Sequence, residues 1–435
     1  MIKKIQQDFS YYSHEFKDNY RKGVHRLRTI LASRAQAQAF VSNAGGTAVV
    51  LGYEPDTPDK NAQELYALLA ASPYIDNAVQ TFLGSIYEAG AESQDAMYSD
   101  SARCLEILHD PVMSRAAGAG TVSAGKWIAT LAGQSCNLYR DMNAVAASDI
   151  AMTAVAASET AMEAVISGTI ALNAVAASKT AMTAVAANET AMAAVAASRV
   201  AMSAIIGNST ALNAVVTSSV AMAAVIGNST ALNAVVSSST AMAAIASSQT
   251  AMAAIIGNST ALNAVVSSST AMAAIASSST AMAAIEKSQV AKDAIAASDM
   301  ATAKYAVGAA GLKPADYANM AAVAASQTAM AAIASSSTAL SAIAASTTAL
   351  NAIYAKKKRM SGASASLSGK FIILQISNDN AFDTSKYGYA TLSDGSKPKW
   401  DSYKDKYAYF KQYKKIATYM KNDTDRDDWI DYFQC

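Results

Sequence analysis

The residues closest to a known chemical pattern are three aspartates near the C-terminal end. Asp423, Asp425 and Asp427 alternate as they do at the start of a calcium-binding loop, where carboxylate oxygens ligate the ion. The pattern departs from such a loop at its sixth and twelfth positions, where Asp428 and Gln434 replace the required glycine and glutamate. These aspartates are therefore weak metal-ligand candidates, and an acidic helix start in solvent is the alternative interpretation.

Side chains for catalysis are scarce in the rest of the chain. The histidines are few and far apart: His14, His25 and His109. The cysteines have no regular spacing and are expected to be free thiols: Cys104, Cys136 and Cys435. From Val200 to Ile285 there is no charged residue, so no general acid, base or metal cluster lies in that stretch. We expect neither an enzyme nor a cofactor.

Aromatic side chains gather at the C-terminal end instead. Tyrosine and tryptophan offer large, rigid contact area with a polar edge, which recognition surfaces need. Core packing is the alternative for any single one of them. The candidates for a binding surface are Trp400, Tyr403, Tyr407, Tyr409, Tyr413, Tyr419 and Trp429.

These candidates follow a long array of ten-residue repeats. Sixteen decads run from Asp141 to Met300, an interruption with Gly311 and Pro314 follows, and four more decads begin at Asn319. The consensus is A-M-x-A-V-A-x-S-x-T, with Met or Leu at position two and Ser, Asn or Gly at position eight. Residues 221–250 and 251–280 differ at only two positions. A chain that copies such a block and still folds must contact mainly its near neighbours.

The decad predicts short helices separated by polar steps. Ten residues of α-helix fall about 80° short of three full turns, so an apolar stripe would spiral around one long helix. We expect each decad to be a helix of Ala-Met-x-Ala-Val-Ala capped by Thr, with an extended step of two or three residues. A trimeric, coiled-coil-like rod is the favoured arrangement, because a six-residue helix does not persist alone. A single-chain solenoid is the alternative.

Composition and breaks divide the chain into segments. The expected fold class is mainly α, with small terminal domains of which the C-terminal one is α+β. The segments are 1–140, a mostly helical attachment domain; 141–300, the repeat rod; 301–318, the interruption; 319–355, a second repeat block; 356–369, a basic and Ser/Gly linker; and 370–435, a tyrosine-rich tip or docking domain. Residues 45–55 are expected to be a strand or loop, and the end of the chain, beyond the turn at Ser393, to be helical.

Charge and hydropathy exclude several classes of partner. The net charge is +1, which predicts no general affinity for nucleic acid or anionic membranes. No stretch of about 18 apolar residues predicts a membrane span, and the N-terminus lacks the apolar segment of a signal peptide. We therefore expect synthesis in a cytoplasm.

The repeat A-M-x-A-V-A-x-S-x-T resembles the alanine-rich repeat arrays of tail-fibre and related virion proteins of tailed bacteriophages. The likeness covers about residues 141–300 and 319–353. It implies a virion fibre assembled in the host cytoplasm, commonly a homotrimer, that contacts other virion proteins and a host-surface glycan or protein. A purely structural collar, sheath or connecting protein is one alternative, and a cellular adhesin or filament subunit is another.

Overall fold

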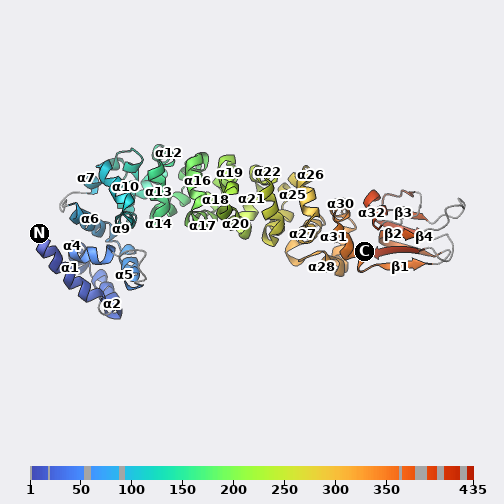
Figure 1. Ribbon diagram of the computed structural model, residues 1–435, viewed down its shortest axis with the longest axis horizontal. Helices are drawn as coiled ribbons and strands as arrows, with labels where there is room; N and C mark the ends of the chain where they lie inside the picture. The colour runs from blue at the N-terminus through green and yellow to red at the C-terminus, as the bar shows by residue number, and fades with distance from the viewer. Residues whose placement is uncertain are drawn as a thin grey trace. The chain divides into compact units, whose positions relative to one another are not determined.

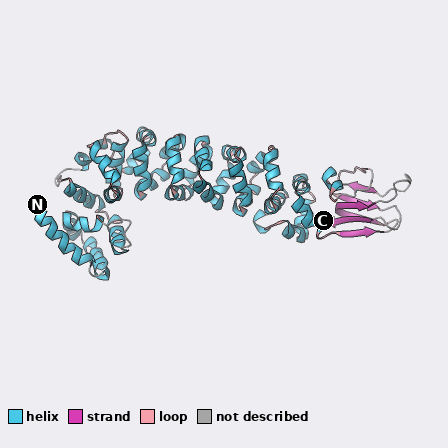
Figure 2. Ribbon diagram, in the orientation of Figure 1, coloured by secondary structure: helices cyan, strands magenta, loops and turns pink. Residues whose placement is uncertain are grey.

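The chain forms two compact units, Met1–Ala231 and Leu232–Cys435, and each is described by itself (Figure 1). The computed structural model describes residues 2–17, 20–52, 60–87, 94–361, 365–377, 389–398, 406–421 and 429–435. Helices dominate both units, and the described strands belong to one antiparallel sheet near the C-terminus (Figure 2). The predicted class, mainly α with a small C-terminal α+β region, is confirmed.

The first unit opens with helices α1 (Ile2–Lys17), α2 (Tyr20–Ala32), α3 (Arg34–Val41), α4 (Ala44–Leu51), α5 (Lys60–Ala70), α6 (Ile75–Ile86) and α7 (Gln94–Tyr98). The expectation of a strand or loop from residue 45 was wrong for its described part. The Asn43 side chain accepts a hydrogen bond from the Gly46 amide at 2.7 Å and starts α4. This helix packs between α1 and α6, so it is apolar on all sides and shows no helical periodicity in its sequence.

Each decad is a helix of up to nine residues that ends at one extended residue, with a turn of one or two residues between them in some decads, as at Gly207. In the first unit these helices are α11 (Met142–Ala147), α12 (Asp149–Ala157), α13 (Glu159–Ser167), α14 (Thr169–Ala177), α15 (Lys179–Ala187), α16 (Glu189–Ala197), α17 (Arg199–Ile206), α18 (Ser209–Thr217) and α19 (Ser219–Gly227). Helix α20 (Ser229–Ser237) contains the division between the units. The second unit continues with α21 (Ser239–Ser247), α22 (Gln249–Ile256), α23 (Ser259–Ser267), α24 (Ser269–Ala276), α25 (Ser279–Glu286), α26 (Gln289–Ala296), α28 (Met320–Ala325), α29 (Gln327–Ile333), α30 (Ser337–Ala345) and α31 (Thr347–Tyr354).

The capping residue of a decad is the one at position eight, most often serine and in some decads asparagine or glycine, and not the threonine predicted from the sequence. Ser158 is extended, with φ −103° and ψ 116°, and its hydroxyl accepts a hydrogen bond from the Ala161 amide at 3.2 Å. Threonine at position ten lies inside the helix that follows, as Thr160 does in α13. One extended residue, and not the two or three predicted, is enough to change the chain direction between helices. Ser158 alone separates α12 from α13, and the two helix axes differ by about 100°.

Within each unit the decads stack on decads of the same chain. Successive turns of about 100° bring the path round, so that each helix contacts the third and, less closely, the fourth helix after it. Helices α16 and α19 are one such pair in the first unit (Figure 1). Positions one, two, five and six form the buried face, as Ala151, Met152, Val155 and Ala156 do in α12.

The capping serine also joins stacked decads. The Ser268 hydroxyl donates to the Val236 carbonyl at 2.7 Å, three decads earlier, and Ser218 donates to the Ala186 carbonyl in the same way. One hydroxyl therefore satisfies an amide at a helix start and a carbonyl in the neighbouring layer. Thirty residues are one step of this stacking, which gives a physical reason why a thirty-residue block is duplicated in the sequence.

Each unit contains one turn built around a buried lysine. In the first unit the turn joins α10 (Thr121–Leu131), the short 3-10 helix η1 (Cys136–Leu138) and α11, and in the second it joins α27 (Asp299–Ala309), η2 (Pro314–Asp316) and α28. The Lys126 ammonium donates to the carbonyls of Cys136 and Tyr139, both at 3.4 Å. The Lys304 ammonium donates to the equivalent carbonyls of Pro314 and Tyr317, at 3.1 and 3.2 Å.

The helix caps around the two lysine turns also have the same spacing. Helix-capping residues stand ten residues apart before each turn: Asp100, Asp110 and Gly120 in the first unit, and Ser278, Ser288 and Ser298 in the second. The next caps, Asp141 and Asn319, both follow twenty-one residues later. The ten-residue spacing thus begins at α8 (Ser101–His109) and α9 (Pro111–Ala117), ahead of the predicted start of the array at Asp141.

The C-terminal sheet has the strand order β1-β5-β2-β4-β3. Its strands are β1 (Lys358–Ser361), β2 (Ser366–Ser377), β3 (Tyr389–Leu392), β4 (Ala417–Lys421) and β5 (Trp429–Gln434), and α32 (Ala408–Tyr413) precedes β4. The stretch predicted as a linker supplies β1 and the beginning of β2. The expectation that the end of the chain is helical was wrong for its described part beyond α32, because β5 is buried on both faces and its run of apolar residues hides the alternation of a strand.

Candidate functional site

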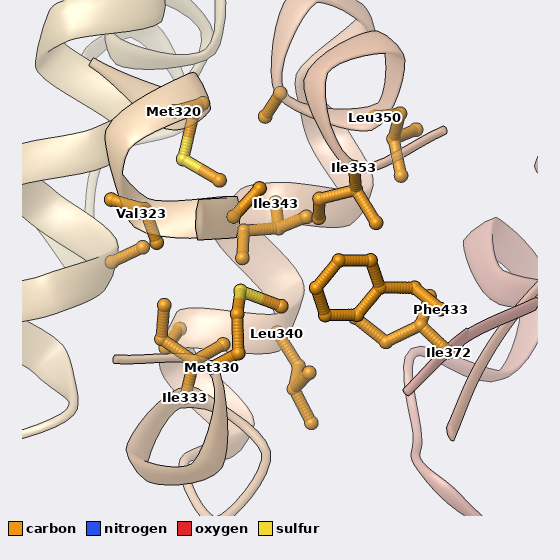
Figure 3. Packing of buried hydrophobic residues seen from close by; sticks show 14 of the residues in the cluster. Met320, Val323, Met330, Ile333, Leu340, Ile343, Leu350, Ile353, Ile372 and Phe433 are labelled. Atoms are coloured by element: carbon orange, nitrogen blue, oxygen red, sulfur yellow. The ribbon is translucent and has the colours of Figure 1, made fainter. Parts of the chain in front are cut away.

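The C-terminal sheet is docked on the last decads of the second unit. Ile372 and Leu374 of β2 and Phe433 of β5 are buried in one apolar cluster with residues of α28, α30 and α31. Figure 3 shows Ile372 and Phe433 next to Leu340, Ile343 and Ile353 of the decad helices. The array therefore does not end in solvent at α31, because the sheet covers the apolar face that a further layer of decads would cover.

A buried carboxylate holds the same junction together. The Asp431 side chain is fully buried and accepts hydrogen bonds from the Arg359 guanidinium at 2.7 and 2.9 Å. The Lys357 ammonium lies 2.9 Å from it, and the hydroxyl of Tyr354, at the end of α31, donates to it at 3.2 Å. Burial alone would raise the pKa of Asp431, but the hydrogen bonds from Arg359 and Lys357 outweigh it and lower this pKa. The basic run at residues 356–359 therefore has a structural role in the part that faces Asp431.

The predicted aromatic binding surface is divided by this docking. Tyr407 and Tyr409 are buried, and the Tyr407 hydroxyl donates to the Asn351 side chain of α31 at 2.6 Å. Tyr413 and Tyr419 are half-buried. Trp429 lies under Arg359, whose guanidinium carbon is 3.7 Å from the centre of the Trp429 ring. Two of these candidates thus belong to the core or the junction, and three remain partly accessible.

Several predicted site residues are not part of the described structure. Trp400, Tyr403 and the three aspartates proposed as calcium ligands, Asp423, Asp425 and Asp427, lie outside the described residues. All three cysteines are free, as expected. Burial raises the pKa of the Cys104 and Cys435 thiols to about 12, so both are protonated near neutral pH and are poor nucleophiles.

A cavity of about 250 Å³ in the second unit is lined by several charged side chains, next to a stretch of decads, 200–285, that has none. It is bounded by α25, α26, α27, α30 and Lys414, the residue after α32. Its charged lining residues are Glu286, Lys292, Asp293 and Lys414. They belong to the first two decads after the uncharged stretch 200–285, except for Lys414 of the C-terminal domain.

Hydrogen bonds fix the polar groups of this cavity. The hydroxyl of the buried Tyr305 donates to the Glu286 carboxylate, and burial together with this bond raises the pKa of Tyr305 far above its usual value. The Gln289 amide donates to Asp293 at 2.7 Å, and the Lys292 ammonium donates to the Glu286 carbonyl at 3.2 Å. Glu286, Lys292 and Asp293 therefore each make at least one hydrogen bond to a neighbouring residue, although the side chains of Glu286 and Asp293 are exposed.

This cavity was not predicted, although two residues of the sequence mark its place. Lys292 stands at position two of its decad, where Met or Leu is buried elsewhere, as Met272 is in α24. Glu286 stands at position six, which is alanine or a β-branched residue in the other decads of 141–300. Two departures from a strict consensus in adjacent decads mark a place where the repeat is not filled by its own side chains.

Comparison with known proteins finds no family model and no curated protein that matches this chain. Among the described residues, no single helix is long and apolar enough to span a membrane, while six bent pairs of decad helices reach the necessary length and hydropathy together.

Proposed function

We propose that the chain is a structural fibre component in which stacked decads provide length and the C-terminal domain closes the end of the array. The observation that supports this most directly is the repeated bond from the position-eight serine to the carbonyl three decads earlier, as from Ser268 to Val236. Each added layer repeats the same contacts, so length changes without a change of core, as in other quasi-one-dimensional proteins.

The resemblance of the decads to virion fibre arrays supports a place in a tailed bacteriophage particle, with host attachment as the specific role. In this proposal the C-terminal domain is the tip, and its partly accessible aromatics contact a host-surface glycan or protein. Several weak contacts add up when more than one tip is presented.

A purely structural virion role, such as a connecting protein, is the second candidate. The burial of Tyr407 and Tyr409 within the chain itself favours it. Tyr407 packs at the junction with α31 and Tyr409 in the core of the sheet, so neither ring is available to an outside partner. In that case the accessible face of the C-terminal domain docks on another virion protein.

Trimer formation remains a prediction, but the decads do not require it. Their apolar face is buried within one chain, as the alternative of a single-chain solenoid requires. We therefore propose a solenoid for the array and assign any assembly of copies to other surfaces. Mass photometry of the purified chain distinguishes a monomer from a trimer.

Immuno-electron microscopy tests the proposed location. Antibodies against residues 361–435 are expected to label an appendage of virus particles in lysates of cells that produce the chain. Label on the producing cells alone, with particles unlabelled, would support the cellular adhesin or filament and contradict the virion proposal.

A further inference from the structure

The cavity lined by Glu286, Lys292, Asp293 and Lys414 has the properties of a ligand site. We propose that it binds one neutral pyranose ring, either as a free sugar or as the terminal unit of a glycan. Such a site is compatible with a virion protein and with a cellular one.

Size limits the ligand first. A volume of about 250 Å³ lies just below the roughly 300–1,000 Å³ of pockets that take drug-sized molecules. The cavity therefore has room for one small ring and not for an extended chain of rings. Further units of a glycan would point into solvent.

Charge and hydrogen-bonding capacity limit the ligand next. The two carboxylates of Glu286 and Asp293 and the two ammonium groups of Lys292 and Lys414 cancel in formal charge. A neutral ligand is repelled by none of these four groups. An anion would lie beside the two carboxylates and a cation beside the two ammonium groups, so either would be repelled by groups of its own sign. Sugar hydroxyls both donate and accept, so they match a mixture of carboxylate acceptors and amine donors.

Hydrogen bonds within the protein engage both carboxylates of the cavity, although the two side chains are exposed. Tyr305 engages one oxygen of Glu286, and Gln289 engages one oxygen of Asp293. Among the described contacts, the second oxygen of each carboxylate has no partner, so it is available to accept a hydrogen bond from a sugar hydroxyl. Side chains held in place before binding lose less entropy when the ligand arrives.

Small apolar residues complete the site. Ile295 and Ala296 of α26 and Ala342 of α30 contribute to its wall. Carbon-bound hydrogens of a pyranose ring can pack on such a surface, while its hydroxyls face the charged groups. Lys292 stands at position two, where Met or Leu is buried in other decads, and its ammonium donates to the Glu286 carbonyl instead.

Ligand-observed NMR and calorimetry on the full chain test the site with a panel of methyl glycosides. The panel contains methyl glucoside, galactoside, mannoside and N-acetylglucosaminide. At least one is expected to bind with a millimolar Kd. Asp293→Ala is expected to weaken that binding about tenfold, the usual cost of one lost charge-assisted hydrogen bond. Glu163→Ala, which removes an exposed acid from the same decad position, is the matched control.

A second variant tests the cavity without removing charge. Ser341→Trp places a large side chain in the cavity from an exposed position of α30, and it is expected to abolish binding. Ser203→Trp is its control at the equivalent decad position of α17. Circular dichroism verifies that all variants keep their helix content.

The outcomes separate the proposal from its alternatives. Failure of every glycoside at tens of millimolar, or binding that survives Ser341→Trp, overturns it. Loss of glycan-array signal in the same variant identifies the ligand as a glycan end, whereas binding of the monomer without an array signal identifies a free sugar. Either result leaves the imaging test of the structural role unaffected.

Discussion

Residues 120–148 and 298–326 fold into the same turn around lysines in different surroundings. In both turns a glycine with positive φ, Gly133 at 71° and Gly311 at 78°, follows the helix, and the next amide bonds back to a carbonyl five residues earlier. In both turns the lysine ammonium donates to two carbonyls of the loop. The shared groups specify the conformation. Besides the lysine and the glycine, Tyr139 and Tyr317 are equivalent, and the decads that follow the turns are nearly identical, whereas most other side chains differ between the two copies.

The difference lies in what else each lysine contacts. Lys126 forms an ion pair with the half-exposed carboxylate of Asp95. Lys304 has no ion pair among the described residues, and burial lowers its pKa, with the more distant Asp316 acting in the opposite direction. A buried ammonium without a carboxylate costs more to desolvate, so the second turn gains less from its lysine than the first does.

The largest effect is expected for Lys126→Met. The substitution leaves two loop carbonyls unsatisfied and removes the partner of Asp95, which should cost about 2–4 kcal/mol of local stability. Hydrogen–deuterium exchange measures this at the amides of η1 and α11. Equal exchange in the wild type and the variant would contradict the stabilising role of Lys126 in this turn.

Lys304→Met is expected to cost less, about 1–2 kcal/mol, because the loss of two charge-assisted bonds is partly offset by relief of desolvation. The same exchange experiment at η2 and α28 gives the second half of the comparison. If the second turn were destabilised more than the first, the ion pair with Asp95 would not be the feature that distinguishes them.

The two glycines should behave alike. Gly133→Ala and Gly311→Ala each place a Cβ in the left-handed region with open space around it, at a cost of about 1 kcal/mol. Denaturant unfolding of both variants checks this equality. A difference beyond experimental error would mean that the turns share less of their backbone energetics than their geometry suggests.

The smallest effect is expected for Asp95→Asn. This change gives the first turn the carbonyl-only surroundings of the second and should cost about 0.5–1 kcal/mol, since the carboxylate is half exposed and screened by solvent. High salt is expected to reduce the difference from the wild type. If neither the substitution nor the salt changed the stability of the first turn, Asp95 would not contribute to it.

The sequence predicts the decads well because a strict repeat averages out local ambiguity. It identified the Ser-x-Thr step as the helix break, but it assigned the cap to Thr, since both hydroxyls cap helices and only the stacking shows that Ser268 also reaches Val236. The caps at Asp100, Asp110 and Gly120 were missed because the residues between them do not follow the consensus.

The candidate sites were harder to predict, because they depend on contacts between distant segments. The aromatics near residue 407 are equally suited to a surface and a core, and only the contact with Asn351 decides for Tyr407. The cavity needs Lys414 beside Asp293, and no local pattern links two residues so far apart in sequence. The burial of Asp431 beside Arg359 could not be predicted either, because these two residues are also far apart in the sequence.

Small-angle scattering on chains of altered length tests the central claim, that three decads form one layer of a stack. Three extra copies of residues 251–280, inserted in register after residue 280, should lengthen the particle by about 24–30 Å, at 8–10 Å for each added layer of packed helices. The account predicts this increase at an unchanged cross-section. A longer chain with the same maximum dimension, or one that thickens instead, would contradict it.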